Sequence, residues 1–228
     1  KLTEPETEKS DVLAGVKGAL GYRQLKLGII AIFFYVGIEV GIPSKLLFYL
    51  SEPLSKGGIL GSAVVGGLIS GFYWLLMLVG RFVSAFISGK VSSRIQLTTT
   101  SVVAISLLLV AIFMPETSKM NLIIPDITHW KLIDAEVPTN VVFIVLCGLC
   151  TSVMWGVIYN LATEGLGRYT ASASGLFMTM VFGGGVMPLI QDLIATKIGD
   201  INSYWLVVAM LSYLLFYALV GSRQSKNN

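Results

Sequence analysis

Six long apolar runs, separated by short polar segments, constrain the fold of this 228-residue chain more than any other feature. A run of roughly 20 apolar residues is long enough to cross the hydrocarbon core of a bilayer as one helix. Only 13% of the residues are charged, about half of the roughly 25% that is typical of soluble domains. The charges lie mostly between the runs, which is typical of a multi-pass membrane protein. We therefore expect an all-α polytopic membrane protein.

The runs predict six membrane-spanning helices and divide the chain into three regions. The helices are expected at residues 27–49, 60–86, 97–113, 141–162, 173–196 and 204–220. The regions are a linker at 1–26, a six-helix bundle at 27–221 with a long polar loop at 115–140, and a tail at 222–228. Residues 11–20 of the linker are either a short helix on the membrane surface or an unstructured segment. Pro43 is expected to kink or end the first span.

The distribution of Lys and Arg predicts the orientation in the membrane. Six spans place both termini on one side, and the short flanks on that side hold most of the basic residues. Because such residues are enriched in cytoplasmic flanks, we expect both termini in the cytoplasm and the 115–140 loop outside. The chain begins with Lys1 rather than Met, so we expect it to be part of a longer protein.

Several functional classes are disfavoured by the sequence. The chain has one histidine, His129, and no Gly-x-Ser-x-Gly or metal-spaced group, which argues against an enzyme and a metal site. No cofactor motif is present, and no basic stretch with interleaved aromatics suggests nucleic acid. Cys147 and Cys150 lie in an apolar run, where thiols are usually packing residues. The run 183–185, followed by Pro188, is either a bendable point beside a cavity or a close-packing site.

Glu39 is the residue with the strongest functional signal. It lies near the middle of the first apolar run, where a carboxylate costs at least about 2.5 kcal/mol on insertion scales. Tyr35 precedes it by one helical turn and therefore faces the same way. One interpretation is a buried acid bonded to a neighbouring helix. We favour the other, in which Glu39 bonds a substrate or exchanges a proton during transport.

Three motifs in this chain resemble the fucose/glucose/galactose–proton symporters of the major facilitator superfamily. They are Phe34-Tyr35-Val36-Gly37-Ile38-Glu39, Gly80-Arg81-Phe82, and Gly165-Leu166-Gly167-Arg168-Tyr169-Thr170 followed by Ser174, Gly183-Gly184-Gly185 and Pro188-Leu189. The resemblance covers the C-terminal half of that fold. It implies a twelve-helix carrier of two six-helix halves with alternating access, whose main proton carboxylates lie in the N-terminal half. Glu39 matches a position that is acidic in the glucose/galactose branch of the family, so the resemblance favours a hexose.

The chain departs from the family pattern at two positions. Gly156 stands where the family usually has proline, so we expect a straighter fourth span. Asp192 follows Gln191 where a small residue is usual.

Amides, carboxylates and aromatic rings together suit a sugar. The predicted substrate-binding residues are Glu39, Tyr35, Gln191, Trp155, Trp74 and Asn160, and Glu39 is also predicted to take part in proton coupling.

The sequence thus predicts the C-terminal six-helix half of a carrier for a glucose-, galactose- or fucose-like sugar. We expect proton symport across the bacterial inner membrane. The expected partners are the sugar, a proton, the lipid bilayer and an N-terminal half of the same carrier. Two alternatives stay open, namely a half-size carrier that acts as a homodimer and a membrane sensor that has this fold but does not transport.

Overall fold

The structure is a computed structural model that describes residues 6–53, 62–87, 89–115, 117–126 and 131–223. Within these ranges, six helical segments are long and apolar enough to cross a membrane. They are Arg23–Ser51, Ala63–Phe86, Ser93–Phe113, Asn140–Thr163, Gly167–Ile198 and Asn202–Gly221. The prediction of a six-span helical bundle is confirmed. The predicted start of the second span, at Leu60, lies outside the described residues.

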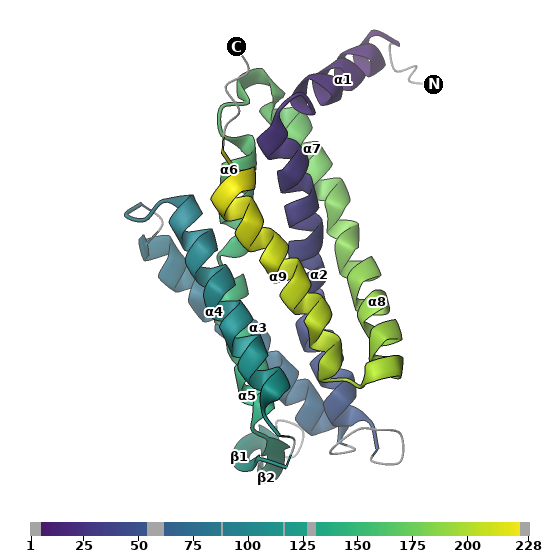
Figure 1. Ribbon diagram of the computed structural model, residues 1–228, viewed down its shortest axis with the longest axis vertical. Coiled ribbons are helices and arrows are strands. Elements are labelled where there is room, and N and C mark those ends of the chain that lie inside the picture. The colour runs from purple at the N-terminus through teal and green to yellow at the C-terminus, as the bar shows by residue number, and fades with distance from the viewer. Residues whose placement is uncertain (1–5, 54–61, 88, 116, 127–130, 224–228) are drawn as a thin grey trace.

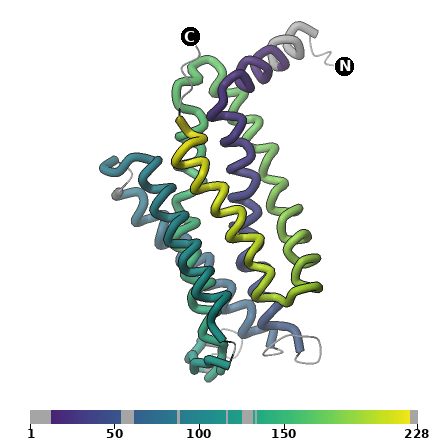
Figure 2. The backbone as a smooth tube through the Cα atoms, in the orientation of Figure 1, coloured from purple at the N-terminus to yellow at the C-terminus, as the bar shows by residue number. Residues whose placement is uncertain are grey.

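The first three spans are single helices, α2 (Arg23–Ser51), α3 (Ala63–Ile87) and α4 (Ser93–Phe113). Helix α2 continues through Pro43, so this proline does not end it. In Figures 1 and 2, α2 runs through the middle of the bundle between α8 and α9, and it contacts α3 and α6 as well. Its central position explains why its residues are buried on most sides.

The fourth span is interrupted. It consists of α5 (Asn140–Thr151) and α6 (Met154–Thr163), with a break at Ser152 and Val153. The Ser152 hydroxyl donates a hydrogen bond to the Leu149 carbonyl at 2.6 Å, and such side-chain bonds to the preceding turn often bend helices. The span is thus interrupted, although Gly156 itself lies within the regular helix α6, so the effect of Gly156 stays a prediction.

The fifth and sixth spans also contain irregular turns. The fifth is built from η2 (Gly167–Tyr169), α7 (Thr170–Thr179), η3 (Met180–Phe182) and α8 (Gly183–Ile198), where η2 and η3 are single 3₁₀ turns. The sixth is built from the 3₁₀ turn η4 (Asn202–Tyr204), α9 (Trp205–Phe216) and the π-helical turn η5 (Tyr217–Gly221). Gly183 lies against the backbone of Phe33 in α2, so the glycine run combines an irregular turn with close packing.

Tyrosine hydroxyls attach the sixth span to α2. Tyr204 donates a hydrogen bond to the carbonyl of Ile42 at 3.2 Å, and Tyr217 donates one to the carbonyl of Gln24 at 3.2 Å. Both tyrosines are almost fully buried. Because an unpaired buried hydroxyl is costly, these bonds fix the position of α2 along α9.

A β-hairpin lies at the end of the bundle opposite α1 (Figure 1). Its strands, β1 (Lys119–Asp126) and β2 (Lys131–Pro138), pair antiparallel with Leu122 opposite Ala135. Ile124, Ala135 and Val137 are buried, and β1 contacts α3. The sequence predicted only a polar loop here. Its residues 127–130, which include His129, lie outside the described residues.

Helix α1 (Glu6–Ala19) lies at the other end of the bundle, beside α7 (Figure 1). It contacts η2 and α7. Gly18 lies against the ring of Tyr169, and Ala19 is fully buried. Of the two interpretations of residues 11–20, the structure favours the helix, which packs against other parts of the chain.

Candidate functional site

The candidate site is centred on an ion pair between α2 and α3. The Glu39 Oε1 atom lies 3.2 Å from the Arg81 Nη2 atom. The Glu39 side chain is 15% exposed, whereas the Arg81 side chain is 55% exposed. Glu39 is near the middle of α2, so the guanidinium reaches the centre of the bundle. The pair therefore combines a mostly buried carboxylate with a cation that is open on one side.

The exposed side of Arg81 belongs to a stripe along α3. Trp74, Leu78 and Arg81 follow the spacing of four and three residues that places side chains on one helical face. Trp74 is 46% exposed and Leu78 is 51% exposed. A guanidinium facing hydrocarbon costs at least about 2.5 kcal/mol. We therefore expect this stripe to face water or another protein segment rather than lipid tails.

Aromatic side chains lie behind the ion pair. Tyr35 is fully buried, and its ring meets Trp155 of α6 edge-on, with ring centroids 6.1 Å apart. The Tyr35 hydroxyl lies near Glu39, but it does not meet the geometry of a hydrogen bond with any described group. Tyr73 is also buried, and its hydroxyl bonds to the Thr151 hydroxyl at 3.0 Å. Of these two hydroxyls, that of Tyr35 is buried without a hydrogen-bond partner among the described residues.

The structure brings three of the six predicted residues together and places a fourth on the stripe of α3. Glu39, Tyr35 and Trp155 lie in one cluster, and Trp74 lies on the stripe that leads to it. Trp74 also packs edge-on against Tyr73, with ring centroids 5.7 Å apart. A carboxylate, a guanidinium, an unpaired hydroxyl and two aromatic rings offer donors, acceptors and stacking surfaces for a polyhydroxylated ligand.

Gln191 lies elsewhere, on the opposite side of α2. It is 1% exposed, and its amide donates a hydrogen bond to the Ser203 hydroxyl at 3.4 Å. A Cβ atom placed on Gly41 would lie 2.9 Å from the Gln191 Oε1 atom. Because Gly41 is two residues from Glu39, the two point about 200° apart around the helix. The structure does not bring Gln191 to the Glu39 cluster.

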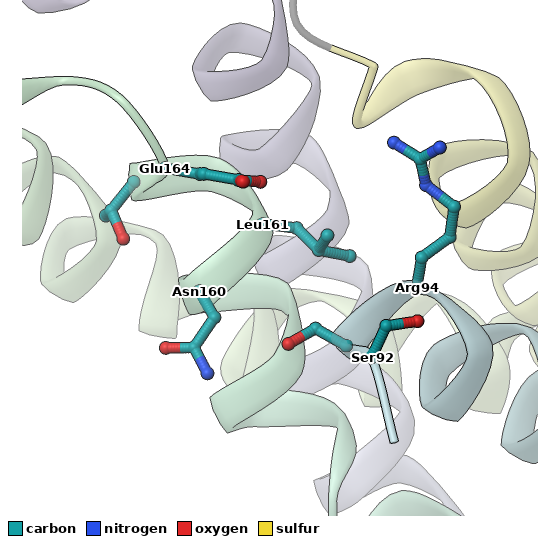
Figure 3. Close-up of a pocket in the computed structure, with 7 residues that line it drawn as sticks. Ser92, Arg94, Asn160, Leu161 and Glu164 are labelled. Carbon is teal, nitrogen blue, oxygen red and sulfur yellow. The ribbon is translucent and has the colours of Figure 1, made fainter. Parts of the chain in front are cut away.

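Asn160 lies in a separate pocket near the end of α6. This pocket has a volume of about 490 Å³ and lies between α6 and the start of α4. Figure 3 shows Asn160 and Glu164 on α6, with Ser92 and Arg94 on the facing segment. Asn160 follows Trp155 by five residues, which is about 7.5 Å along the axis. The structure therefore assigns Asn160 to this pocket rather than to the Glu39 cluster.

Two charged residues that matter in the structure were not predicted as site residues. Arg81 was counted only in a motif and in the charge balance, although an arginine within an apolar run carries the same signal as Glu39. Lys45 is buried and pairs with Asp192 at 3.2 Å and with Asp200 at 2.5 Å. The pairing with Lys45 gives a structural reason for an acidic residue, rather than a small one, at position 192.

Comparison with known sequences gives relatives of one kind. No family model matches the chain. A glucose/galactose transporter of Brucella abortus is 30% identical over 97% of this chain. A putative glucose/galactose transporter of Helicobacter pylori is 27% identical over 93%, and the L-fucose-proton symporter of Escherichia coli is 21% identical over 90%. The chain covers 48%, 47% and 41% of these relatives, or a little under half of each.

Solved structures establish the fold. A crystal structure of the Escherichia coli fucose:proton symporter superposes with a TM-score of 0.75 at 17% identity, covering 93% of this chain and 46% of that one. A structure of a major facilitator superfamily transporter in the outward conformation gives a TM-score of 0.71 at 16% identity, covering 89% and 43%. The chain has the fold of half a major facilitator transporter. The share covered agrees with the predicted C-terminal half, and the relatives of this half-bundle are transporters, not enzymes.

Proposed function

We propose that this chain is the C-terminal half of a secondary carrier that moves a hexose-type sugar across the bacterial inner membrane. Both termini lie in the cytoplasm, and an N-terminal half of the same carrier covers the stripe on α3. The named relatives, two glucose/galactose transporters and a fucose-proton symporter, support the substrate class. The basic residues near both termini support the orientation.

One observation carries the proposal, namely the Glu39–Arg81 pair at 3.2 Å with an exposed guanidinium. A pair that served only to join α2 and α3 would be better shielded, because water weakens an exposed ion pair. A pair at the edge of a water-filled cavity can instead exchange partners. We infer that sugar hydroxyls donate to Glu39 and accept from Arg81 when the sugar binds.

Aromatic rings complete the proposed site. Trp74 and Trp155 are partly exposed and can stack on the apolar face of a sugar ring, while Tyr35 offers its unpaired hydroxyl. Gln191 and Asn160 are left out of this site because they lie on another face of α2 and in another pocket. The proposed site therefore consists of Glu39, Arg81, Tyr35, Trp155 and Trp74.

The ion pair also supports a role in proton coupling. Ionised Glu39 is balanced by Arg81, and a proton on Glu39 removes that balance and frees the guanidinium. Sugar and proton then act on the same pair, which links their binding. Cycling between outward- and inward-facing states would complete proton symport.

The test is sugar uptake by the full-length carrier, expressed from the complete reading frame and reconstituted in liposomes. Radiolabelled glucose, galactose and fucose are compared, with and without an inward proton gradient, for the wild type, Glu39→Gln and Glu39→Ala. We expect the gradient to stimulate uptake of one of these sugars and both variants to lose most of this stimulation. Normal uptake and normal coupling in both variants would refute the role of Glu39.

A separate experiment tests which protein segment covers the α3 stripe. The chain spans about half the length of the curated relatives it matches, which supports an N-terminal half in the same polypeptide. A single cysteine at Leu78, an exposed stripe residue, is crosslinked in native membranes. Crosslinks within one polypeptide support the proposal. Crosslinks between two identical chains favour the homodimer.

A further inference from the structure

A second open groove lies on the other flank of α3. It is formed by α3, the start of α4 and the end of α5, and it has a volume of about 490 Å³. Gly80 and Val83 of α3, Ile95 and Thr99 of α4, Leu149 of α5 and Val153 of the break that follows α5 line it. The helices cross closely where Gly80 meets Ser152. Val83 lies on a different face of α3 from Leu78 and Arg81, so this groove is separate from the proposed sugar site.

The groove is apolar in practice, although several polar residues line it. The Thr100 hydroxyl donates to the Gln96 carbonyl at 2.9 Å, and the Ser152 hydroxyl donates to the Leu149 carbonyl at 2.6 Å. The Gln96 amide donates to the Val91 carbonyl at 2.7 Å. These donors are used within their own helices or the preceding turn, so the side chains present methyl and methylene groups. A hydrocarbon ligand makes no hydrogen bonds with water, so it gives up none when it enters such surroundings. A polar ligand would lose its hydrogen bonds to water there.

The charges around the groove have one sign. The sequence contains no Asp or Glu from residue 53 to residue 115. Lys90 is exposed in the turn that closes one end of the groove, and Arg94 follows one turn later. Within the described part of the chain, neither forms an ion pair, and the Arg94 Nε atom is buried without a hydrogen-bond partner. Glu164 lies in the neighbouring pocket that Arg94 also lines, so the exposed Lys90 is the cation best placed to meet an anionic group at this end.

We propose that this groove binds an anionic phospholipid, with an acyl chain between α3, α4 and α5 and the phosphate at Lys90. The volume is within the roughly 300–1,000 Å³ of ligand pockets. Ile95 is 58% exposed and Val83 is 49% exposed, so a chain can enter from the surrounding bilayer. With the proposed orientation, Lys90 faces the cytoplasmic leaflet, where anionic lipids attract basic residues next to the membrane.

The test uses the full-length protein and a phosphatidylglycerol that carries a photoreactive diazirine in its acyl chain. After illumination, the labelled peptides are identified by mass spectrometry. We expect the labels to concentrate on residues 80–99 and 149–153. Thr99→Phe fills the groove and should lower this labelling, whereas Val103→Phe, an equally exposed position one turn further along α4, should not.

The headgroup is tested by competition with unlabelled lipid. Lys90→Gln should weaken competition by phosphatidylglycerol roughly fivefold, the equivalent of about 1 kcal/mol per basic residue at the surface. Arg23→Gln, at an exposed basic position at the start of α2, serves as the control and should leave it unchanged. Even labelling of all exposed apolar faces would overturn the proposal. So would equal competition by phosphatidylcholine, or equal effects of Thr99→Phe and Val103→Phe. A sugar-uptake defect has no bearing on these readouts.

Discussion

Two charged side chains of helix α2, Glu39 and Lys45, each form an ion cluster, and the two clusters are of different kinds. Lys45 is 10% exposed and contacts two carboxylates, Asp192 of α8 and Asp200 of the turn before η4. Glu39 contacts one cation, Arg81, which is 55% exposed. The first cluster is closed around its buried charge, whereas the second is open on the side of the cation.

The difference indicates two roles for charge in the same bundle. A buried ammonium with two carboxylate partners joins α2 to α8 and to the turn that leads into the sixth span, so we assign it a structural role. A buried carboxylate with one exposed partner is able to exchange that partner for a ligand or a proton. The number of partners and the exposure of the least exposed one therefore separate the two clusters: within the described residues, Lys45 has two carboxylates, of which Asp200 is 23% exposed, whereas Glu39 has one cation that is 55% exposed.

The largest expected effect follows from removing the open cation. Arg81→Gln leaves Glu39 without its counter-ion and removes a donor to the substrate. We expect initial-rate uptake at low sugar to fall about 100-fold, because hydrogen bonds to charged groups contribute about 1.5–3 kcal/mol. Radiolabelled uptake in liposomes measures this, and Arg81→Lys should recover part of it.

The matched control for Arg81 is on the same stripe. Leu78→Gln introduces the same amide three residues earlier, at a position that is also about half exposed. It should lower uptake much less than Arg81→Gln. Equal losses in the two variants would mean that the stripe tolerates no polar change and that Arg81 has no special role.

Disrupting the cluster around Lys45 should lower the stability of the bundle rather than the rate of transport. Lys45→Met leaves Asp192 and Asp200 without their shared cation. Breaking a fully buried pair costs roughly 3–5 kcal/mol; here Asp192 is 49% exposed, so we expect a loss of about 2 kcal/mol. Thermal unfolding in detergent checks this, and Asp200→Asn added to Lys45→Met should restore part of it.

The control for Lys45 is the exposed pair on the hairpin. Lys119 and Glu136 are 47% and 60% exposed and 3.4 Å apart. Lys119→Met should change the stability by less than about 0.5 kcal/mol, because surface ion pairs contribute little. A large effect there, or none for Lys45→Met, would remove the distinction between the clusters.

The packing between α2 and α8, across which Lys45 meets Asp192, gives a smaller test. A Cβ atom at Gly183 would collide with the carbonyl of Phe33, whereas at Gly185 nothing lies within 4 Å. Gly183→Ala should therefore destabilise the bundle by about 1–3 kcal/mol. Gly185→Ala should be neutral or stabilise it by up to about 1 kcal/mol. The two substituted positions are two residues apart, and thermal unfolding of both variants decides whether this glycine run packs tightly or bends freely.

The spans could be predicted because a bilayer demands long apolar runs, and each run identifies its own helix. The interruptions within these spans could not be predicted. The break at Ser152 depends on a hydroxyl that bonds to its own helix and on the approach of Gly80, and both are tertiary facts. The hairpin was missed because Ile124 and Val137 are buried, and β1 contacts α3, although the overall composition of the segment is polar.

The site was partly predictable for a related reason. Tyr35 and Glu39 share a face of one helix, and periodicity reports such relations. Periodicity cannot say which face of α8 meets which face of α2, so Gln191 was grouped with Glu39 although it packs against Gly41. Arg81 could have been found, because an arginine in an apolar run carries the same cost as a carboxylate.

The smallest expected effect concerns Gln191 and separates the two sides of α2 directly. Gln191→Leu keeps the volume of the side chain and removes one hydrogen bond, of 3.4 Å, to Ser203. We expect the KM for sugar to change less than about twofold and the stability to fall by about 1 kcal/mol. Ser203→Ala, which removes the same bond from the other partner, should behave alike. An increase in KM of tenfold or more for Gln191→Leu, with none for Ser203→Ala, would show that the amide reaches the substrate and that α2 must turn during transport to present it.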